Sequence, residues 1–294
     1  MRRRLNDGLN MQEALIDILK PGRLTSIIDV GANPIDGNPP YKAMLEAGLC
    51  QIIGFEPQPE ALARLRKSAT ENETYLPYAL GDGREHTLHI CRASGMTSLL
   101  EPDNQRLKLF NLFEKFGDVS ERISINTVRL DDVKEINELD FLKIDVQGSE
   151  LSIFSNGIEL LRKATAVQTE VSFIPLYVNQ PTFGQLDTFL RKLDFVPHCF
   201  SSIKRWALSP TVFNNNPRSP GNQLLEADII YVKDFPKLIK MESEKIKHLA
   251  MVSHHIFRSF DLVNLTLLEL EKRGEIKRDS VKQYIASFST PPSK

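Results

Sequence analysis

The chain has 294 residues, of which 41% are hydrophobic and 26% charged, enough apolar material for one large α/β domain with an appendage or for two small domains. Its 37 Lys and Arg residues nearly balance its 38 Asp and Glu residues, which argues against a nucleic-acid partner. No run approaches the roughly 20 apolar residues of a membrane span, and Cys50, Cys91 and Cys199 lack metal-type spacing. We therefore expect a soluble cytoplasmic protein with reduced cysteines, no membrane span and no bound metal.

The first part of the chain alternates short apolar runs with amphipathic segments. Apolar β-branched runs of this length are typical of buried strands, and apolar residues at helical spacing predict helices. Proline and glycine mark the breaks, above all in the rigid loop 34–40. The pattern predicts helices over Met11–Leu19, Tyr41–Ala47 and Pro59–Ala69, and strands over Thr25–Val30, Gln51–Phe55 and Thr74–Leu80.

The remainder continues this alternation, interrupted by two exposed ribbon strands. A long segment rich in Asn, Pro, Ser and Gly, Ser209–Asn222, is expected to be an irregular loop, and loops of this length are often functional. Ser149 is positioned to cap the helix that follows it. The predicted elements are ribbon strands over Thr87–Ile90 and Ile123–Val128, strands over Phe141–Val146, Ala166–Phe173, Phe195–Phe200 and Ala227–Val232, a helix over Phe183–Lys192, and helices from Pro236 to Ser289.

Strands that alternate with helices predict a Rossmann-like α/β fold, a doubly wound and mostly parallel sheet with one reversed strand, followed by a C-terminal helical appendage. We expect a helical lead-in at 1–22, a ligand-binding domain at 23–235 and a helical extension at 236–294. Ligands of such sheets bind at the carboxyl ends of the strands, where the strand order reverses. Six residues are expected at those ends, namely Asp29, Gly31, Asn33, Glu56, Asp82 and Asp145.

These residue types indicate a nucleoside-binding site. A glycine lets backbone approach a ligand, and a carboxylate at the end of the second strand accepts hydrogen bonds from a ribose diol. A dinucleotide would need the glycine pattern G-x-G-x-x-G, but Asn33 and Asp36 occupy its second and third glycine positions. Carboxylates near the ligand suit a nucleoside that carries a positive centre and no phosphate. S-adenosylmethionine, with its cationic sulfur, fits this description.

Five stretches, in this order, resemble the FkbM family of S-adenosylmethionine-dependent methyltransferases. The resemblance extends over roughly Ser26 to Val232 and implies a class I methyltransferase type of sheet. It departs from the family's pattern where a glycine is usual two residues after Asn33, because Ile35 stands there and the nearest glycine is Gly37. The stretches are Ile28–Asn33, Gly54–Pro57, Ala79–Asp82, Met96–Leu99 and Phe141–Glu150.

The resemblance implies a role for each matching residue. Asp29, Gly31 and Asn33 would form the cofactor loop, Glu56 would hold the ribose hydroxyls, and Asp82 would meet the adenine edge. The same resemblance adds further cofactor-site residues, namely Ala32, Pro57, Ser98 and Asp145.

A hydroxyl acceptor also benefits from a general base. Asp145 is the first candidate because it ends the central strand, and Glu150 and Glu170 follow. Each has a structural alternative: Asp145 as a cofactor or turn contact, Glu150 as an acid in the first turn of a helix, and Glu170 as the partner of a buried cation.

Other polar and aromatic residues carry weaker signals. His86 and His89 would point to opposite faces of a strand, which disfavours a metal site. His254 and His255 are expected at the surface of a helix, while Tyr177 and Trp206 either stack on a sugar ring or belong to the core.

The leading hypothesis is therefore an O-methyltransferase acting on a carbohydrate or small-molecule acceptor. The alternatives are a nicotinamide-dependent oxidoreductase and a non-catalytic nucleoside-binding or partner-docking protein on the same fold. The apolar C-terminal helices are expected to dock on the core domain or on a second subunit, which would make a homo-oligomer.

Overall fold

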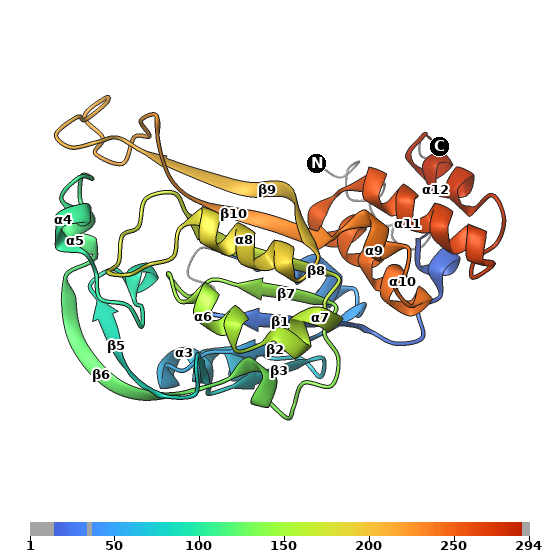
Figure 1. Ribbon diagram of the computed structural model, residues 1–294, viewed down its shortest axis with the longest axis horizontal. Coiled ribbons are helices and arrows are strands. Elements are labelled where there is room, and N and C mark those ends of the chain that lie inside the picture. Colours follow the sequence, from blue (N-terminus) through green and yellow to red (C-terminus); the bar gives the residue numbers. More distant parts are fainter. Residues whose placement is uncertain (1–14, 34–36, 290–294) are drawn as a thin grey trace. The chain divides into compact units, whose positions relative to one another are not determined.

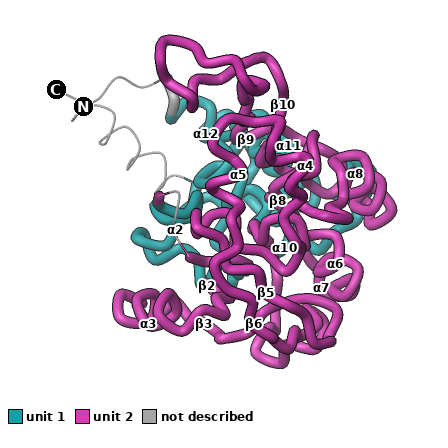
Figure 2. Tube along the Cα trace, turned by 90° about the vertical axis from the view of Figure 1, so that its left-hand side faces the viewer, with its two compact units in different colours: residues 1–26, 38–51, 234–294 teal, residues 27–37, 52–233 magenta. Residues whose placement is uncertain are grey.

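A computed structural model describes residues 15–33 and 37–289, and within these it divides the chain into two compact units (Figure 2). Unit 1 takes its described residues from Met1–Ser26, Asn38–Gln51 and Asp234–Lys294, and unit 2 from Ile27–Gly37 and Ile52–Lys233. Of the predicted first helix, residues 15–19 are helical, while its start at Met11 and the loop residues Pro34–Asp36 lie outside the described residues.

Unit 2 contains most of a seven-stranded sheet in the order β3-β2-β1-β7-β8-β10-β9. The pairs β2–β3, β1–β7 and β7–β8 are parallel, and β10 is antiparallel to both of its neighbours. The predicted mostly parallel sheet with one reversed strand is thus confirmed. Its strands are β1 (Thr25–Val30), β2 (Cys50–Phe55), β3 (Glu73–Leu76), β7 (Phe141–Ile144), β8 (Ala166–Ser172), β9 (Phe195–Trp206) and β10 (Gln223–Lys233).

The strand order reverses between β1 and β7. The chain adds β2 and β3 on one side of β1, then returns to place β7 and β8 on the other side. In open α/β sheets, a ligand crevice lies at the carboxyl ends of the two strands that flank such a reversal. The fold itself therefore points to the residues that follow β1 and β7.

Helices α6 (Glu150–Ser155), α7 (Ile158–Lys163) and α8 (Phe183–Lys192) cover one face of this sheet (Figure 1). Their apolar side chains, among them Phe154, Leu161 and Leu190, join strand residues such as Leu142 and Val167 in the main core. Helix α3 (Pro59–Ser68) packs separately, with Leu62 and Leu65 against Ala32 and Tyr75. All six residues of β1 are buried, as expected of a strand covered on both faces.

A second, three-stranded sheet has the order β4-β6-β5, with β4 (Ala79–Leu80), β5 (Glu85–Cys91) and β6 (Val119–Val128). The predicted antiparallel ribbon is confirmed, because β5 and β6 pair along their length. The prediction of one strand over Thr74–Leu80 is wrong: Pro77 separates β3 of the large sheet from β4 of the small one. Proline lacks the N–H that a continuous central strand would need.

Two short helices, α4 (Asn104–Leu107) and α5 (Phe113–Phe116), follow β5 and bury Leu107, Phe110 and Phe113 in a second apolar cluster. The segment between β9 and β10 is irregular, as predicted, and it contacts this region. The backbone N–H of Ser209 donates to the carbonyl of Leu109 at 2.8 Å. Strands β8 and β9 run in the same direction, because both are antiparallel to β10. The segment after β9 therefore begins at the end of the sheet where β8 also ends.

Unit 1 is helical and is assembled from three separate stretches of chain. Its helices are α2 (Lys42–Glu46), α9 (Phe235–Leu238), α10 (Ser243–Val252), the π-helix η3 (Ser253–Phe257), α11 (Phe260–Arg273) and α12 (Ser280–Ser289). Helix α10 holds the segment before β1: the ring Nδ1 of His248 lies 3.0 Å from Thr25 Oγ1, and Glu244 Oε1 accepts from the backbone N–H of Gly22 at 2.6 Å. Within residues 15–33 and 37–289, no helix is long and apolar enough to cross a bilayer.

The expectation that His254 lies at the surface is wrong. Its side chain is buried, and its Nδ1 lies 2.7 Å from the hydroxyl of Tyr284 on α12. Burial, assisted by the charge of Arg258, lowers the pKa of His254 from 6.5 to about 4. His255, also on η3, has its pKa lowered to about 3 by burial and by His254.

Unit 1 should therefore lose stability in acid. His254 takes up its proton near pH 6.5 in the unfolded chain but near pH 4 in the fold, so protonation favours unfolding as the pH falls through this window. The loss should reach about 3 kcal/mol by pH 4, since one pKa unit corresponds to about 1.4 kcal/mol. Urea unfolding of the wild type and of His254→Gln at a series of pH values isolates this contribution. Parallel stability curves for the two proteins would contradict it.

Candidate functional site

The carboxyl ends of β1 and β7 meet without an intervening side chain. The backbone N–H of Asp145 donates to the carbonyl of Val30 at 3.1 Å. Gly31 follows with a φ of +78°, and a Cβ atom built on it would overlap the backbone oxygen of Asp145. Only glycine accepts both this conformation and this approach. The two strand ends therefore form a backbone cradle at the point where the strand order reverses.

Glu56 joins this cradle from the end of β2. The backbone N–H groups of Gly31 and Ala32 both donate to the carbonyl of Phe55, at 3.2 and 3.1 Å, which places Glu56 next to the turn that follows β1. Its carboxylate is 3% exposed, and Oε1 accepts from the N–H of Gln58 at 2.8 Å across Pro57. Burial raises the pKa of Glu56, against the effects of the Gln58 hydrogen bond and the charge of Arg64. Hydrogen-bond donors on a ligand would stabilise this buried carboxylate.

Asp29 forms a buried ion pair that the sequence did not predict. Its Oδ1 lies 3.0 Å from Lys143 Nζ, and Lys143 Nζ also donates to the carbonyl of Gly31 at 3.4 Å. Burial opposes the charge on Lys143, but Asp29 and Asp145 outweigh it, so the pKa of Lys143 is raised. Asp29, which is 1% exposed, is thus connected to the backbone of Gly31 through a lysine of the neighbouring strand.

Gln147, two residues beyond Asp145, is the centre of the polar network at the end of β7. Its Nε2 donates to Asp145 Oδ1 at 2.9 Å and to Glu170 Oε2 at 2.8 Å. Its Oε1 accepts from the hydroxyl of Tyr177 at 3.3 Å, and its backbone carbonyl accepts from Ser98 Oγ at 2.7 Å. Two predicted base candidates are therefore connected through a residue that sequence reasoning had given no role.

Glu150 and Ser149 differ in their contacts from what the sequence suggested. Ser149 stands at the N-terminus of α6, but its side chain makes no capping hydrogen bond, so the predicted cap is wrong. Instead Glu150 Oε1 accepts from the backbone N–H groups of Val146 and Gly148, at 3.0 and 3.1 Å. Burial raises the pKa of Glu150 to about 7, although both hydrogen bonds oppose the shift. Its contacts hold the turn that carries Gln147.

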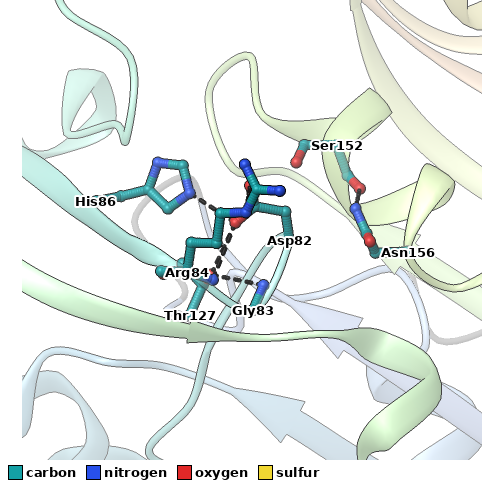
Figure 3. A network of polar contacts seen from close by, with 7 residues as sticks. All are labelled: Asp82, Gly83, Arg84, His86, Thr127, Ser152 and Asn156. Atoms are coloured by element: carbon teal, nitrogen blue, oxygen red, sulfur yellow. Dashed lines mark hydrogen bonds and ion pairs between the residues drawn. The ribbon is translucent and has the colours of Figure 1, made fainter.

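Asp82 lies in the turn between β4 and β5, two strands of the three-stranded sheet, and does not follow a strand of the large sheet. Its Oδ1 lies 2.7 Å from His86 Nε2 and accepts from the N–H of Arg84 at 3.1 Å, and Thr127 Oγ1 lies 3.4 Å away (Figure 3). The His86 hydrogen bond is the main reason that the pKa of Asp82 is lowered. The expectation that Asp82 ends a strand of the binding sheet is wrong, and its contact with adenine stays a prediction.

Tyr177 and Trp206 belong to the second apolar cluster. Tyr177 is 2% exposed, and its single O–H proton has two acceptors within reach, the carbonyl of Met96 at 3.1 Å and Gln147 Oε1 at 3.3 Å. The ring of Trp206 packs edge-on against Phe113, with centroids 4.9 Å apart. Of the two readings that the sequence left open, core packing is the one observed.

The residues at the cradle fit S-adenosylmethionine. The backbone of Gly31 leaves room for close approach, Glu56 is a buried carboxylate suited to a diol, and the half-buried Asp145 is a carboxyl group suited to a cationic ligand. Ser98 is buried and bonded to Gln147, so it connects the segment 96–100 to this edge, while Asn33 ends the described part of the loop. No group of three His, Cys, Asp or Glu side chains in the described ranges is arranged to hold a metal ion.

Comparisons with known proteins agree with this chemistry. A family model described as the methyltransferase FkbM domain matches residues 29–197, more than half of the chain. The 2-O-methyltransferase NoeI of Sinorhizobium fredii (strain NBRC 101917 / NGR234) is 27% identical over 192 residues, which are 60% of this chain and 75% of that protein. The matched range contains the ends of β1 and β7 and the Gln147 network.

Solved structures with a similar chain path include two methyltransferases. A methyltransferase FkbM from Methylobacillus flagellatus KT has a TM-score of 0.38 at 11% identity, over 78% of this chain and 59% of that one. The magnesium protoporphyrin IX methyltransferase ChlM from Synechocystis PCC 6803, crystallised with bound S-adenosylmethionine, has a TM-score of 0.38 at 9% identity, over 77% of this chain and 81% of that one.

Proposed function

Because the chain belongs to the FkbM family of S-adenosylmethionine-dependent methyltransferases, we propose that it methylates a hydroxyl group on a carbohydrate or another small acceptor. The observation that carries the proposal is the half-buried carboxylate of Asp145 beside the backbone cradle of Gly31. A relative that is named a 2-O-methyltransferase supports the same acceptor class.

S-adenosylmethionine, when bound, supplies a methyl group activated by a cationic sulfur. We assign Gly31 and Ala32 to backbone contacts with it, Asn33 and Pro57 to the rim of the same site, and Glu56 to its ribose hydroxyls. The buried pair of Asp29 and Lys143 holds the carbonyl of Gly31 in place. These residues bind and orient, and orientation supplies most of the rate of an in-line displacement.

On the acceptor side, Asp145 is the best placed of the three candidate bases. It is half-buried, whereas Glu150 and Glu170 are 3% and 7% exposed. One oxygen of each glutamate is engaged, Glu150 Oε1 by two backbone N–H groups and Glu170 Oε2 by Gln147, as Asp145 Oδ1 is by Gln147, so exposure is what distinguishes Asp145. We assign Asp145 the role of accepting the hydroxyl proton as the methyl group is transferred, and Glu150 the role of holding the turn.

Methyl transfer from radiolabelled S-adenosylmethionine to a panel of sugars and simple alcohols tests the proposal. Amines and thiols of similar size serve as the comparison panel. Label found on oxygen, with S-adenosylhomocysteine released in equal amount, is the expected result. Label found only on nitrogen or sulfur would overturn the hydroxyl assignment while leaving the family assignment intact.

Glu56→Gln should weaken S-adenosylhomocysteine binding by about tenfold or more, because a charge-assisted hydrogen bond contributes about 1.5–3 kcal/mol. The amide oxygen can still accept from Gln58, so the fold should persist. Isothermal titration calorimetry measures the affinity. Glu60→Gln, an exposed residue in the first turn of α3, is the matched control. Equal affinity in all three proteins would remove Glu56 from the binding site.

A further inference from the structure

The turn after β7 holds Gln147 in an uncommon backbone conformation. Gln147 has a φ of +57° and Gly148 a φ of +105°, two consecutive residues in the left-handed half of the φ range. A Cβ on Gly148 would come within 3.0 Å of Gln180 Cγ and 3.1 Å of Leu100 Cδ1, so the turn is closely packed. Glu150 Oε1 stabilises the turn by accepting hydrogen bonds from the backbone N–H groups of Val146 and Gly148. Such conformations persist where the surroundings enforce them, and they cluster at functional sites.

The amide of Gln147 places its donors and its acceptor opposite matching groups in this network. Asp145 and Glu170 present oxygen atoms as acceptors, and Tyr177 presents an O–H donor. The NH2 group therefore faces the two carboxyl groups and donates one N–H to each, while Oε1 accepts from Tyr177. The three contacts together hold this side chain between the two carboxyl groups and Tyr177.

The two carboxyl groups would behave differently without the amide between them. Two carboxyl groups in direct contact share one proton and titrate as a pair, so the base would be the pair and not Asp145 alone. Burial raises the pKa of Glu170 well above its usual range, and Glu226, Asp145 and Glu150 raise it further, against Lys204. Glu226 and Lys204 face it from β10 and β9, and they bond to each other at 2.6 Å. Glu170 is thus the group that would offer its proton to Asp145.

We propose that Gln147 is a positioning residue for methyl transfer, which separates Asp145 from Glu170 and orients the Asp145 carboxylate to accept the proton of the hydroxyl acceptor. This role rests on the proposed function. It predicts that the length, the neutrality and the donor capacity of this side chain are all needed. Glutamate has the same length but brings a third carboxyl group, and methionine has a similar length but no donor.

The test compares Gln147→Glu and Gln147→Met with the wild type. In Gln147→Glu, the acid limb of the profile of kcat against pH should move up by at least about one pH unit, because each added carboxylate raises the pKa of its neighbours. In Gln147→Met, kcat at pH 7 should fall about tenfold or more, with less than about threefold change in the KM of the acceptor. S-adenosylhomocysteine affinity should stay within about threefold in both variants.

A second readout needs neither cofactor nor turnover. Carbon-13 NMR of protein labelled at its glutamate carboxyl carbons gives the titration of Glu170, identified by its loss in Glu170→Gln. Its midpoint should rise by at least about one pH unit in Gln147→Glu. Gln180→Met is the matched control, since Gln180 packs on Gly148 and bonds to the backbone of Leu176 and Tyr177. It perturbs the same turn and should leave both the pH profile and the Glu170 midpoint unchanged.

The outcomes separate this proposal from the one it rests on. An unchanged Glu170 midpoint in Gln147→Glu, or a shifted midpoint with an unchanged pH profile, overturns the role of Gln147 while hydroxyl methylation stands. Equal shifts in Gln180→Met would overturn it as well, since packing alone would then explain them. A wild type that methylates no hydroxyl overturns the proposed function and this role with it, whatever the NMR titration shows.

Discussion

Asp145→Asn should lower kcat by a factor of about 100 to 10,000, which is the usual contribution of a general base. The substitution removes the carboxylate and with it the ability to accept the proton of the acceptor hydroxyl. It keeps the shape of the side chain, and its carbonyl oxygen can still accept from Gln147 Nε2. Steady-state kinetics at saturating S-adenosylmethionine measure the loss, and circular dichroism confirms the fold.

Cofactor affinity separates the two roles that Asp145 can have. S-adenosylhomocysteine binding that stays within about threefold of wild type identifies a base. Binding that weakens tenfold while kcat stays unchanged would instead identify Asp145 as a cofactor contact. Glu170 would then be the candidate for the general base. Asp132→Asn, at an exposed carboxylate in the turn after β6, is the matched control and should leave kcat unchanged.

Gly31→Ala should reduce S-adenosylhomocysteine affinity by about 100-fold or more, a loss of about 2.7 kcal/mol or more. The added methyl group would overlap the backbone oxygen of Asp145, so the ends of β1 and β7 must separate. The φ of +78° adds conformational strain of about 1–2 kcal/mol for any residue with a side chain. Calorimetric titration measures the binding loss, and thermal unfolding measures the strain.

Gly48→Ala provides the matched control, because Gly48 has a φ of +68° but no atom within 4 Å of its would-be Cβ. It should show the strain alone, with unchanged cofactor affinity. If Gly31→Ala and Gly48→Ala have the same stability and the same cofactor affinity, the close approach of the ends of β1 and β7 is not required for cofactor binding.

The strand ends of the site could be predicted because each is a local pattern. The predicted runs Thr25–Val30, Gln51–Phe55 and Phe141–Val146 are short and mostly apolar, and each contains or nearly matches a strand, although β7 ends at Ile144 rather than Val146. That their carboxyl ends lie at one end of the sheet also followed, since the strands are parallel, whereas the strand order was not predicted.

The ion pair and the side-chain hydrogen bonds of the site could not be predicted, because the residues that form them are distant in sequence. Lys143 lies within an apolar strand run, and nothing local pairs it with Asp29, 114 residues earlier. Gln147 precedes Glu170 by 23 residues and Tyr177 by 30. Two other wrong predictions had different causes. The division of Thr74–Leu80 into β3 and β4 could have been predicted from Pro77. The burial of His254 could not, because two adjacent histidines show no periodicity that distinguishes a buried helix face from an exposed one.

The assembly of unit 1 from three stretches of chain has a consequence for synthesis on the ribosome. The segment before β1 emerges first, yet its partners His248 and Glu244 lie more than 220 residues later. Until α10 has left the exit tunnel, the segments 15–26 and 38–51 have apolar side chains, such as Leu19 and Met44, without the helices that complete their unit. At synthesis rates of about 5–20 residues per second, this interval lasts about ten seconds or longer. The nascent chain thus carries these apolar side chains without their helical partners through most of its own synthesis.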